Sequence, residues 1–186
     1  MRGNALLAAA FAALLVGSGC SKPGMTVTDG EGNRATVSAD GTKTTYTDSQ
    51  GKSSTVEAKP DGSVSIKADD GKSSYEGGTT LTEEELGVPF YPGSAEKPNT
   101  AFKADTPTEQ SRLSVRTTSD DPAKVAEFYK GKVKDAKVSS MAMEQQEMQL
   151  VHGKTESGGE ITVTATRQKG SSETEVNIAT VFKKTK

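Results

Sequence analysis

Turn signals recur about every ten residues along the first part of this chain, and they constrain its fold more than any other feature. Six glycine-containing pairs divide the region into short segments: Asp29-Gly30, Asp40-Gly41, Gln50-Gly51, Asp61-Gly62, Asp70-Gly71 and Gly77-Gly78. Apolar and polar residues alternate between them, as at Val64, Ile66 and Ala68. Asp-Gly between alternating segments is a strong hairpin signal, because glycine tolerates the positive φ of tight turns. Residues 25–80 are therefore predicted to form an antiparallel β-meander of about five short, Thr/Ser-rich strands.

The apolar face of this predicted meander is thin. Apart from small residues, it offers Tyr46 and Tyr75. At about 25 cal/mol per Å² of buried apolar area, such a face cannot offset the entropy lost on ordering the chain. Three outcomes stay open: a single-layer sheet, a face covered by the second half of the chain or by a partner, or partial disorder.

Residues 81–186 carry signals of a different kind. Thr82 and Glu85 have the spacing of a capping box, which starts a short helix. Asp120 or Asp121 is predicted to cap a second helix, with Pro122 at its first position. An apolar face then follows at helical spacing, made of Val125, Phe128, Tyr129 and Val133.

Four further segments of this half are predicted to be strands: 112–117, 141–151, 161–165 and 176–182. The segment 141–151 is the most ambiguous of them, and its alternation favours a strand over a helix. One amphipathic helix against several antiparallel strands predicts a small two-layer α/β sandwich. The fold class predicted for the whole chain is α+β, with the meander followed by this sandwich.

The N-terminus has the form of an export signal. One positive charge, Arg2, precedes an apolar run from Ala5 to Val16, and three small residues then lead to Cys20. The run is shorter than the roughly 20 residues that cross a bilayer as a helix, and it matches the apolar region of a signal peptide. Cys20 is the single cysteine of the chain, so an exported protein would have no disulfide partner for it.

Leu15 to Cys20 resembles the lipobox that bacterial lipoprotein signal peptidase reads. Ser18 and Gly19 suit that pattern, and Gly17 stands where Leu is usual. The resemblance implies that residues 1–19 are a signal peptide and residues 20–24 a lipidated tether. Cys20 would then carry a diacylglycerol thioether and an acylated amine, with chains such as palmitate. The alternative is an ordinary thiol in a chain cut by the general signal peptidase.

Several acyl chains make a stable membrane anchor. Ser21 follows the cysteine, and by resemblance to Gram-negative lipoproteins a residue other than Asp there is compatible with the outer membrane. The predicted location is the bacterial cell envelope, at the periplasmic face of the outer membrane rather than the inner membrane.

Residues 86–186 show a second resemblance. Pro89 to Ser94, then Thr118 to Asp121, then Val125 to Tyr129 are similar to a small "YPGA…sD..V..FY" domain of uncharacterised secreted proteins and lipoproteins. Ser94 stands where Ala is commoner in that group. The resemblance implies export and a compact domain, and no activity.

The sequence contains no recognisable catalytic set. The chain has one histidine, and its one cysteine is assigned to lipid. It lacks a G-x-S-x-G elbow, a P-loop and a dinucleotide fingerprint. A net charge of −2 gives no basic footprint for nucleic acid. We therefore expect no enzymatic activity, no cofactor and no nucleic-acid partner; a hydrolase built on two carboxylates is the open exception.

One group of residues has the chemistry of a soft-metal site. Met141, Met143, Met148 and His152 lie close together in sequence, and thioether and imidazole ligands suit Cu(I). The competing interpretation is that the methionines fill gaps in a core and that His152 is an exposed strand residue.

These features predict a membrane-anchored cell-envelope lipoprotein that acts as a non-enzymatic structural or partner-binding module. Its partners would be the membrane, through the lipid, and an envelope protein. The alternative is a periplasmic carrier of a small ligand or metal, which would need an apolar pocket lined by Phe90, Tyr91 and Phe128.

Overall fold

The computed structural model describes residues 24–69 and 71–184. The predicted signal peptide and Cys20 lie outside these residues. The first half of the described chain contains β1 (Met25–Thr28), β2 (Arg34–Val37), β3 (Lys43–Thr47), β4 (Ser53–Ala58), β5 (Val64–Ala68) and β6 (Ser74–Thr79). The second half contains α1 (Glu83–Leu86), β7 (Ala95–Glu96), β8 (Ala101–Asp105), β9 (Glu109–Thr118), α2 (Pro122–Lys130), β10 (Lys134–Ala142), β11 (Gln146–Lys154), β12 (Glu160–Gln168) and β13 (Thr174–Lys183).

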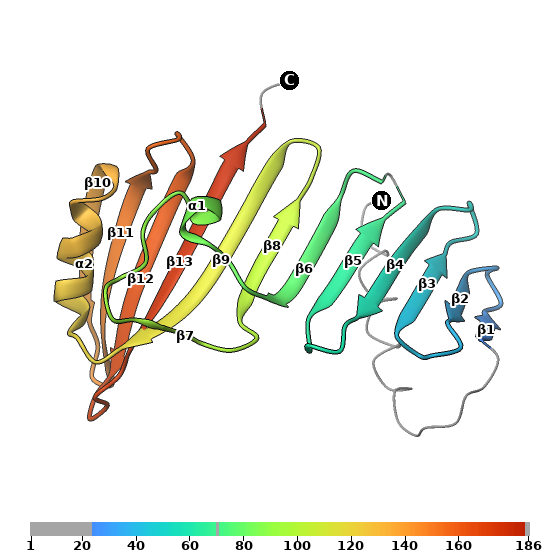
Figure 1. Cartoon of the computed structure of the whole chain (residues 1–186), viewed down its shortest axis with the longest axis horizontal. Coiled ribbons are helices and arrows are strands. Elements are labelled where there is room, and N and C mark those ends of the chain that lie inside the picture. The colour runs from blue at the N-terminus through green and yellow to red at the C-terminus, as the bar shows by residue number, and fades with distance from the viewer. Residues whose placement is uncertain (1–23, 70, 185–186) are drawn as a thin grey trace.

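All strands belong to one antiparallel sheet of 13 strands, in the order β1-β2-β3-β4-β5-β6-β8-β9-β13-β12-β11-β10, with β7 paired to β9 (Figure 1). The predicted α+β fold class, a meander followed by a separate two-layer sandwich, is therefore wrong. The strands of both halves share one hydrogen-bonded sheet, because β6 pairs with β8, with Tyr75 opposite Ala104 and Gly77 opposite Phe102. Sequence patterns identify strands but not non-local partners, so this junction was not anticipated.

The aspartates of the meander stabilise its turns. The carboxylates of Asp40 and Asp61 accept the backbone N–H groups of Thr42 (3.1 Å) and Ser63 (2.9 Å). Such Asx turns hold the chain where it reverses. Gly41 and Gly62 have φ values of 72° and 84°, as the hairpin signal requires. The carboxylates of Asp29 and Asp48 accept backbone N–H groups in the same way. The meander has six strands where about five were expected.

A single hydrophobic core lies between one face of the sheet and the helices of the second half. The buried residues of α2 are Pro122, Val125, Ala126 and Tyr129, and the helix packs on β10, β11 and β12 (Figure 1). From the sheet, the core takes every second residue of the central strands: Val151, Ile161, Val163, Ala165, Val176 and Ile178. Asp121 occupies the N-cap position and Pro122 the first turn, so the predicted start of this helix is confirmed, but the Asp121 side chain makes no capping hydrogen bond.

The chain between β6 and β8 covers the rest of that face. It contains α1, whose capping box between Thr82 and Glu85 is confirmed. Gly87 ends α1 with a φ of 72°. Leu86 is fully buried, and α1 lies against β9 and β13. This segment crosses the sheet as a partial second layer and then returns to its plane as β8.

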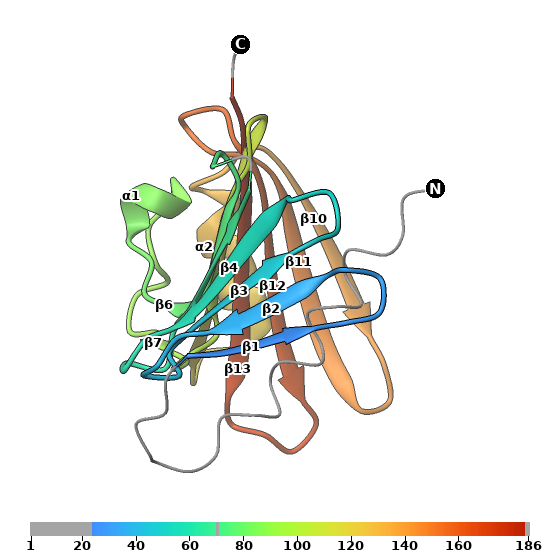
Figure 2. The ribbon, with the colours of Figure 1, turned by 90° about the vertical axis from the view of Figure 1, so that its right-hand side faces the viewer.

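The predicted strand over 141–151 is in fact a hairpin. β10 ends at Ala142 and β11 begins at Gln146, and Met143 N–H donates to the Gln146 carbonyl at 2.8 Å across the turn. The sheet twists continuously, so that β1 and β2 run steeply across the direction of β13 (Figure 2). Within the described residues, neither helix has the length and apolar character needed to cross a membrane.

We expect Ile178→Ala to lower the free energy of unfolding by about 2–5 kcal/mol, because this fully buried side chain would leave a cavity in the core. Thr164→Ala, on the uncovered face of the same sheet, should cost less than about 1 kcal/mol. Urea unfolding followed by circular dichroism measures both. Equal costs would contradict the one-sided core.

Candidate interaction surface

Registers in the sheet show which side chains share a face. Directly opposed residues of an antiparallel pair point to the same side. One row crosses the first six strands through Met25, Val37, Thr44, Val56, Ile66 and Tyr75. A second row runs through Val27, Ala35, Tyr46, Ser54 and Ala68. A third runs through Ala58, Val64, Gly77, Phe102, Leu113 and Ala179.

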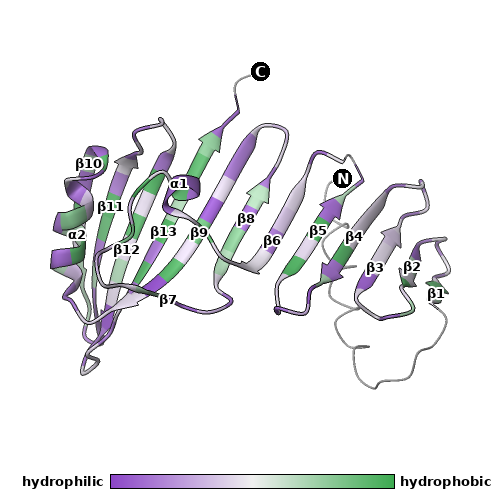
Figure 3. Ribbon diagram, in the orientation of Figure 1, coloured by the Kyte–Doolittle hydropathy of each residue, from purple (hydrophilic) through white to green (hydrophobic). Residues whose placement is uncertain are grey.

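We call this side of β1–β6 and β8, composed of these rows up to Phe102 together with Ala104, the apolar face. None of its side chains carries a charge. Figure 3 shows apolar positions recurring along the same strands, among more polar neighbours. Leu113, Ala179 and Val181 continue the face beyond β8 onto β9 and β13.

The charged residues within the strands of the meander lie on the opposite face. A row of threonines, Thr26, Thr36, Thr45 and Thr55, crosses four strands and continues to Lys67 on β5. Hydroxyl groups join Thr26 to Thr36 at 3.2 Å and Thr45 to Thr55 at 3.5 Å. Arg34, Lys43, Glu57 and Glu76 occupy the same side. The meander is thus a single layer with one uncharged face and one polar, charged face.

The apolar face is accessible in the described structure. Val27 is 54% exposed, Met25 48%, Val64 39%, and Tyr75 and Phe102 36% each. The rings of Tyr75 and Phe102 stack with their centroids 6.5 Å apart, at the junction of β6 and β8. The helices cannot cover this face, because they pack on the other side of the sheet, where Val163 and Ile178 point. Of the outcomes left open by the sequence, the described structure shows the single-layer sheet.

The four residues considered for copper are only partly brought together. Met141 lies directly opposite Met148 in the β10–β11 hairpin, and Met143 lies in the turn. His152 is four residues further along β11, which is about 13 Å in a strand. Its Nδ1 lies 3.1 Å from the Thr162 hydroxyl. The described residues contain no group of three or more His, Cys, Asp or Glu placed to hold a metal.

Phe90, Tyr91 and Phe128 pack tightly. The rings of Tyr91 and Phe128 meet edge to face at 5.4 Å, and the Arg116 guanidinium lies 3.8 Å from the centre of the Phe90 ring. The Tyr91 hydroxyl donates to Asp120 at 2.8 Å. Each of the three rings is thus in contact with another side chain of the protein, which argues against the apolar pocket that a carrier would need.

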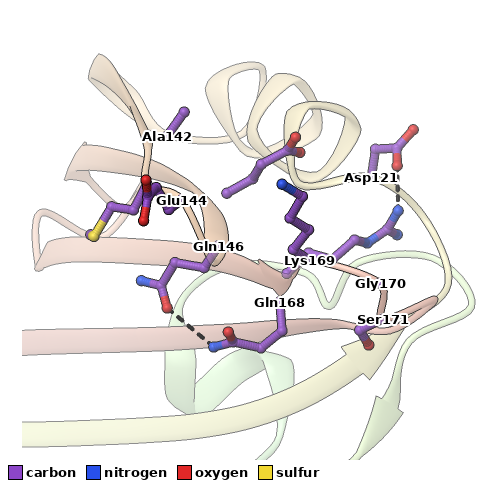
Figure 4. A pocket seen from close by; sticks show the side chains of 11 residues that line it. Asp121, Ala142, Glu144, Gln146, Gln168, Lys169, Gly170 and Ser171 are labelled. Carbon is purple, nitrogen blue, oxygen red and sulfur yellow. Dashed lines mark hydrogen bonds and ion pairs between the residues drawn. The ribbon is translucent and has the colours of Figure 1, made fainter.

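A hollow of about 510 Å³ lies between the β10–β11 turn, the β12–β13 turn and the start of α2. Its lining is Asp121, Ala142, Met143, Glu144, Gln146, Glu147, Arg167, Gln168, Lys169, Gly170 and Ser171. Figure 4 shows Lys169 standing between the two turns and Gln168 bonded to Gln146, at 3.1 Å. Acidic and basic groups are mixed in this lining, so it selects neither anions nor cations.

Arg167 is committed to structure in this hollow. Its Nη2 donates to the carbonyls of Ser119 and Asp120, both at 2.7 Å, and its Nε donates to the Thr174 hydroxyl at 3.0 Å. Its Nη1 pairs with Asp121, the N-cap residue of α2. Arg167 therefore fastens the start of α2 to β12 and β13 and has little capacity left for an anionic ligand. The apolar face remains the strongest candidate surface.

Replacing Arg167 by Lys should lower the free energy of unfolding by about 2 kcal/mol, because an ammonium cannot reproduce the guanidinium fork. Arg34→Lys, on the exposed charged face, should change it by less than about 0.5 kcal/mol. Thermal and urea unfolding compare the two. An Arg167→Lys variant as stable as Arg34→Lys would show that the fork contributes little.

The Tyr91 hydroxyl, assisted by Lys124, holds the pKa of the Asp120 carboxyl below its usual range. Because the pKa of this carboxyl is lower in the folded than in the unfolded chain, its ionisation stabilises the fold at pH values above the unfolded pKa. This contribution is lost as the pH falls through the folded pKa. Tyr91→Phe should therefore raise the Asp120 pKa, and its destabilisation should shrink below about pH 4. Carboxyl NMR titration and unfolding at neutral and acid pH measure these effects. Tyr75→Phe should leave the Asp120 pKa unchanged.

Comparisons with models of protein families, with curated proteins and with solved structures find no match for this chain.

Proposed function

We propose that this protein is a lipid-anchored component of the bacterial cell envelope and that it works as a non-enzymatic partner-binding module. The observation that carries the proposal is the exposed, uncharged face of a sheet that begins just after the lipidation motif. β1 starts at Met25, five positions after Cys20. The surface suited to a partner and the anchor are therefore joined by a very short tether.

The meander also suits the role of a spacer. Its six strands are hydrogen-bonded in sequence order, and five spacings of about 4.8 Å place β6 about 24 Å from β1. The helix-covered part of the sheet follows beyond β6. An anchor before β1 would hold β1 nearest the membrane and present the rest of the sheet to the periplasm.

The chemistry of the described side chains supports binding over catalysis. The one histidine contacts a threonine hydroxyl. The most buried arginine among the ion pairs, Arg112, is matched to Asp105 at 3.1 Å, and Arg167 is matched to Asp121. These pairs join elements of the fold. By contrast, exposed apolar side chains on a sheet are a feature of protein–protein contact sites.

Cys20→Ala should abolish acyl labelling and move most of the protein from the membrane fraction to the soluble fraction, because it removes the acceptor of the lipid. Ser21→Ala is the matched control and should keep both the label and the membrane association. Metabolic labelling with an alkyne fatty acid, followed by cell fractionation, measures both. Unchanged labelling of Cys20→Ala would contradict the anchor.

A further inference from the structure

We infer that the apolar face binds a second copy of this chain, so that two meanders pack face to face as a two-layer β-sandwich. This inference rests on the proposed function for the membrane location, and it adds the identity of the partner and the surface that binds it. Val27, Met25 and Val64 are between 39% and 54% exposed on a face without charges, and no layer covers it in the described structure. Such a face gains stability when it is removed from water.

A second copy fits the charge pattern of this face. A surface that pairs with itself about a two-fold axis meets its own residues, so any charge near the axis would meet a like charge. The apolar face carries none, whereas the opposite face carries Arg34, Lys43, Glu57, Lys67 and Glu76. A strongly charged partner would instead leave its own charges desolvated and unpaired against this surface.

The geometry and size also fit. Two twisted sheets of the same hand pack at about −30° with about 10 Å between them, the arrangement of β-sandwiches. Seven strands, β1–β6 and β8, spaced by about 4.8 Å and about 17 Å long, give roughly 570 Å² per copy, or about 1,100 Å² for the pair. That area exceeds the roughly 1,000 Å² that a biological interface should clear and is the size of weak, transient interfaces.

A bilayer surface fits this face less well. Membrane-bound surfaces combine apolar residues with lysines and arginines that meet anionic lipids. Here the basic residues within the strands of the meander, Arg34, Lys43 and Lys67, lie on the other side of the sheet. The strong twist of the sheet also prevents the face from lying flat on a planar surface (Figure 2). Copies anchored in one membrane, in contrast, share a plane, which raises their effective concentration for each other.

The test uses the full chain, expressed in its host with two different epitope tags, and a cell-permeant bis-maleimide as the crosslinker. Val64→Cys, on the apolar face, should give a band of twice the chain mass that carries both tags. Glu57→Cys, on the charged face of the neighbouring strand, should not. Adding Val27→Lys to Val64→Cys should reduce the dimer band at least fivefold, because it places a charge in the interface. Adding Thr26→Lys, one residue away on the other face, should leave the band unchanged.

Equal crosslinking from Glu57→Cys and Val64→Cys, or a dimer band that Val27→Lys does not reduce, would overturn the inference. A Val64→Cys adduct with another protein and none with a second copy would overturn it too, while leaving the proposed partner-binding role intact. The acyl label of Cys20 is followed in the same samples. Dimers without the label would contradict the anchor alone, and labelled protein without dimers would contradict the self-association alone.

Discussion

The pairing of β6 with β8 is the contact on which the rest of the structure depends. Glu76 lies opposite Lys103 and Gly77 opposite Phe102, so the last strand of the meander joins the sheet that carries the core. An isolated meander with a thin apolar face has too little buried area to offset its conformational entropy. Pairing of β6 with the edge of the stable part of the sheet supplies backbone hydrogen bonds and a fixed register. The meander can then remain a single layer next to a part of the sheet that has a core.

That single layer has two chemically different sides, and the difference follows from the period of a strand. Successive residues point to opposite faces, so polar residues at every second position, as at Thr26 and Thr28 or Thr55 and Glu57, leave Val, Ala, Tyr and Ile on the other side. Because the turns keep the strands in register, small local alternations add up to one continuous surface. This surface is continuous from Met25 on β1 to Phe102 on β8, and the proposed self-association would use it.

Much of the local structure could be predicted from the sequence, because it is encoded by neighbouring residues. The capping box at Thr82 and Glu85, the helix start at Asp121 and Pro122, and the Asp-Gly turns all depend on contacts within a few positions. The elements that the sequence did not predict depend on pairing between strands. β8 is only five residues long, so its alternation is a weak signal. The β10–β11 hairpin has no glycine at its turn, and alternation alone therefore predicted one strand in place of two. The apolar face was expected to be thin because it offers only small residues besides Tyr46 and Tyr75. The rows that extend it from β5 and β6 to Phe102 and Leu113 cross the predicted boundary at residue 80.

By itself, the sequence determined where the chain turns, which residues alternate and where the α2 helix starts, since each depends on backbone preferences and near neighbours. It also carries the lipobox-like motif at Cys20, on which the proposed anchor rests. Only the tertiary structure decided that the two halves form one sheet, that the helices cover one side of its second half, and that the uncharged residues of the first half form a single exposed face. The physical reason is that all strands pair through the same backbone hydrogen bonds, which do not distinguish one strand from another. The burial of a shared core selects which strands pair.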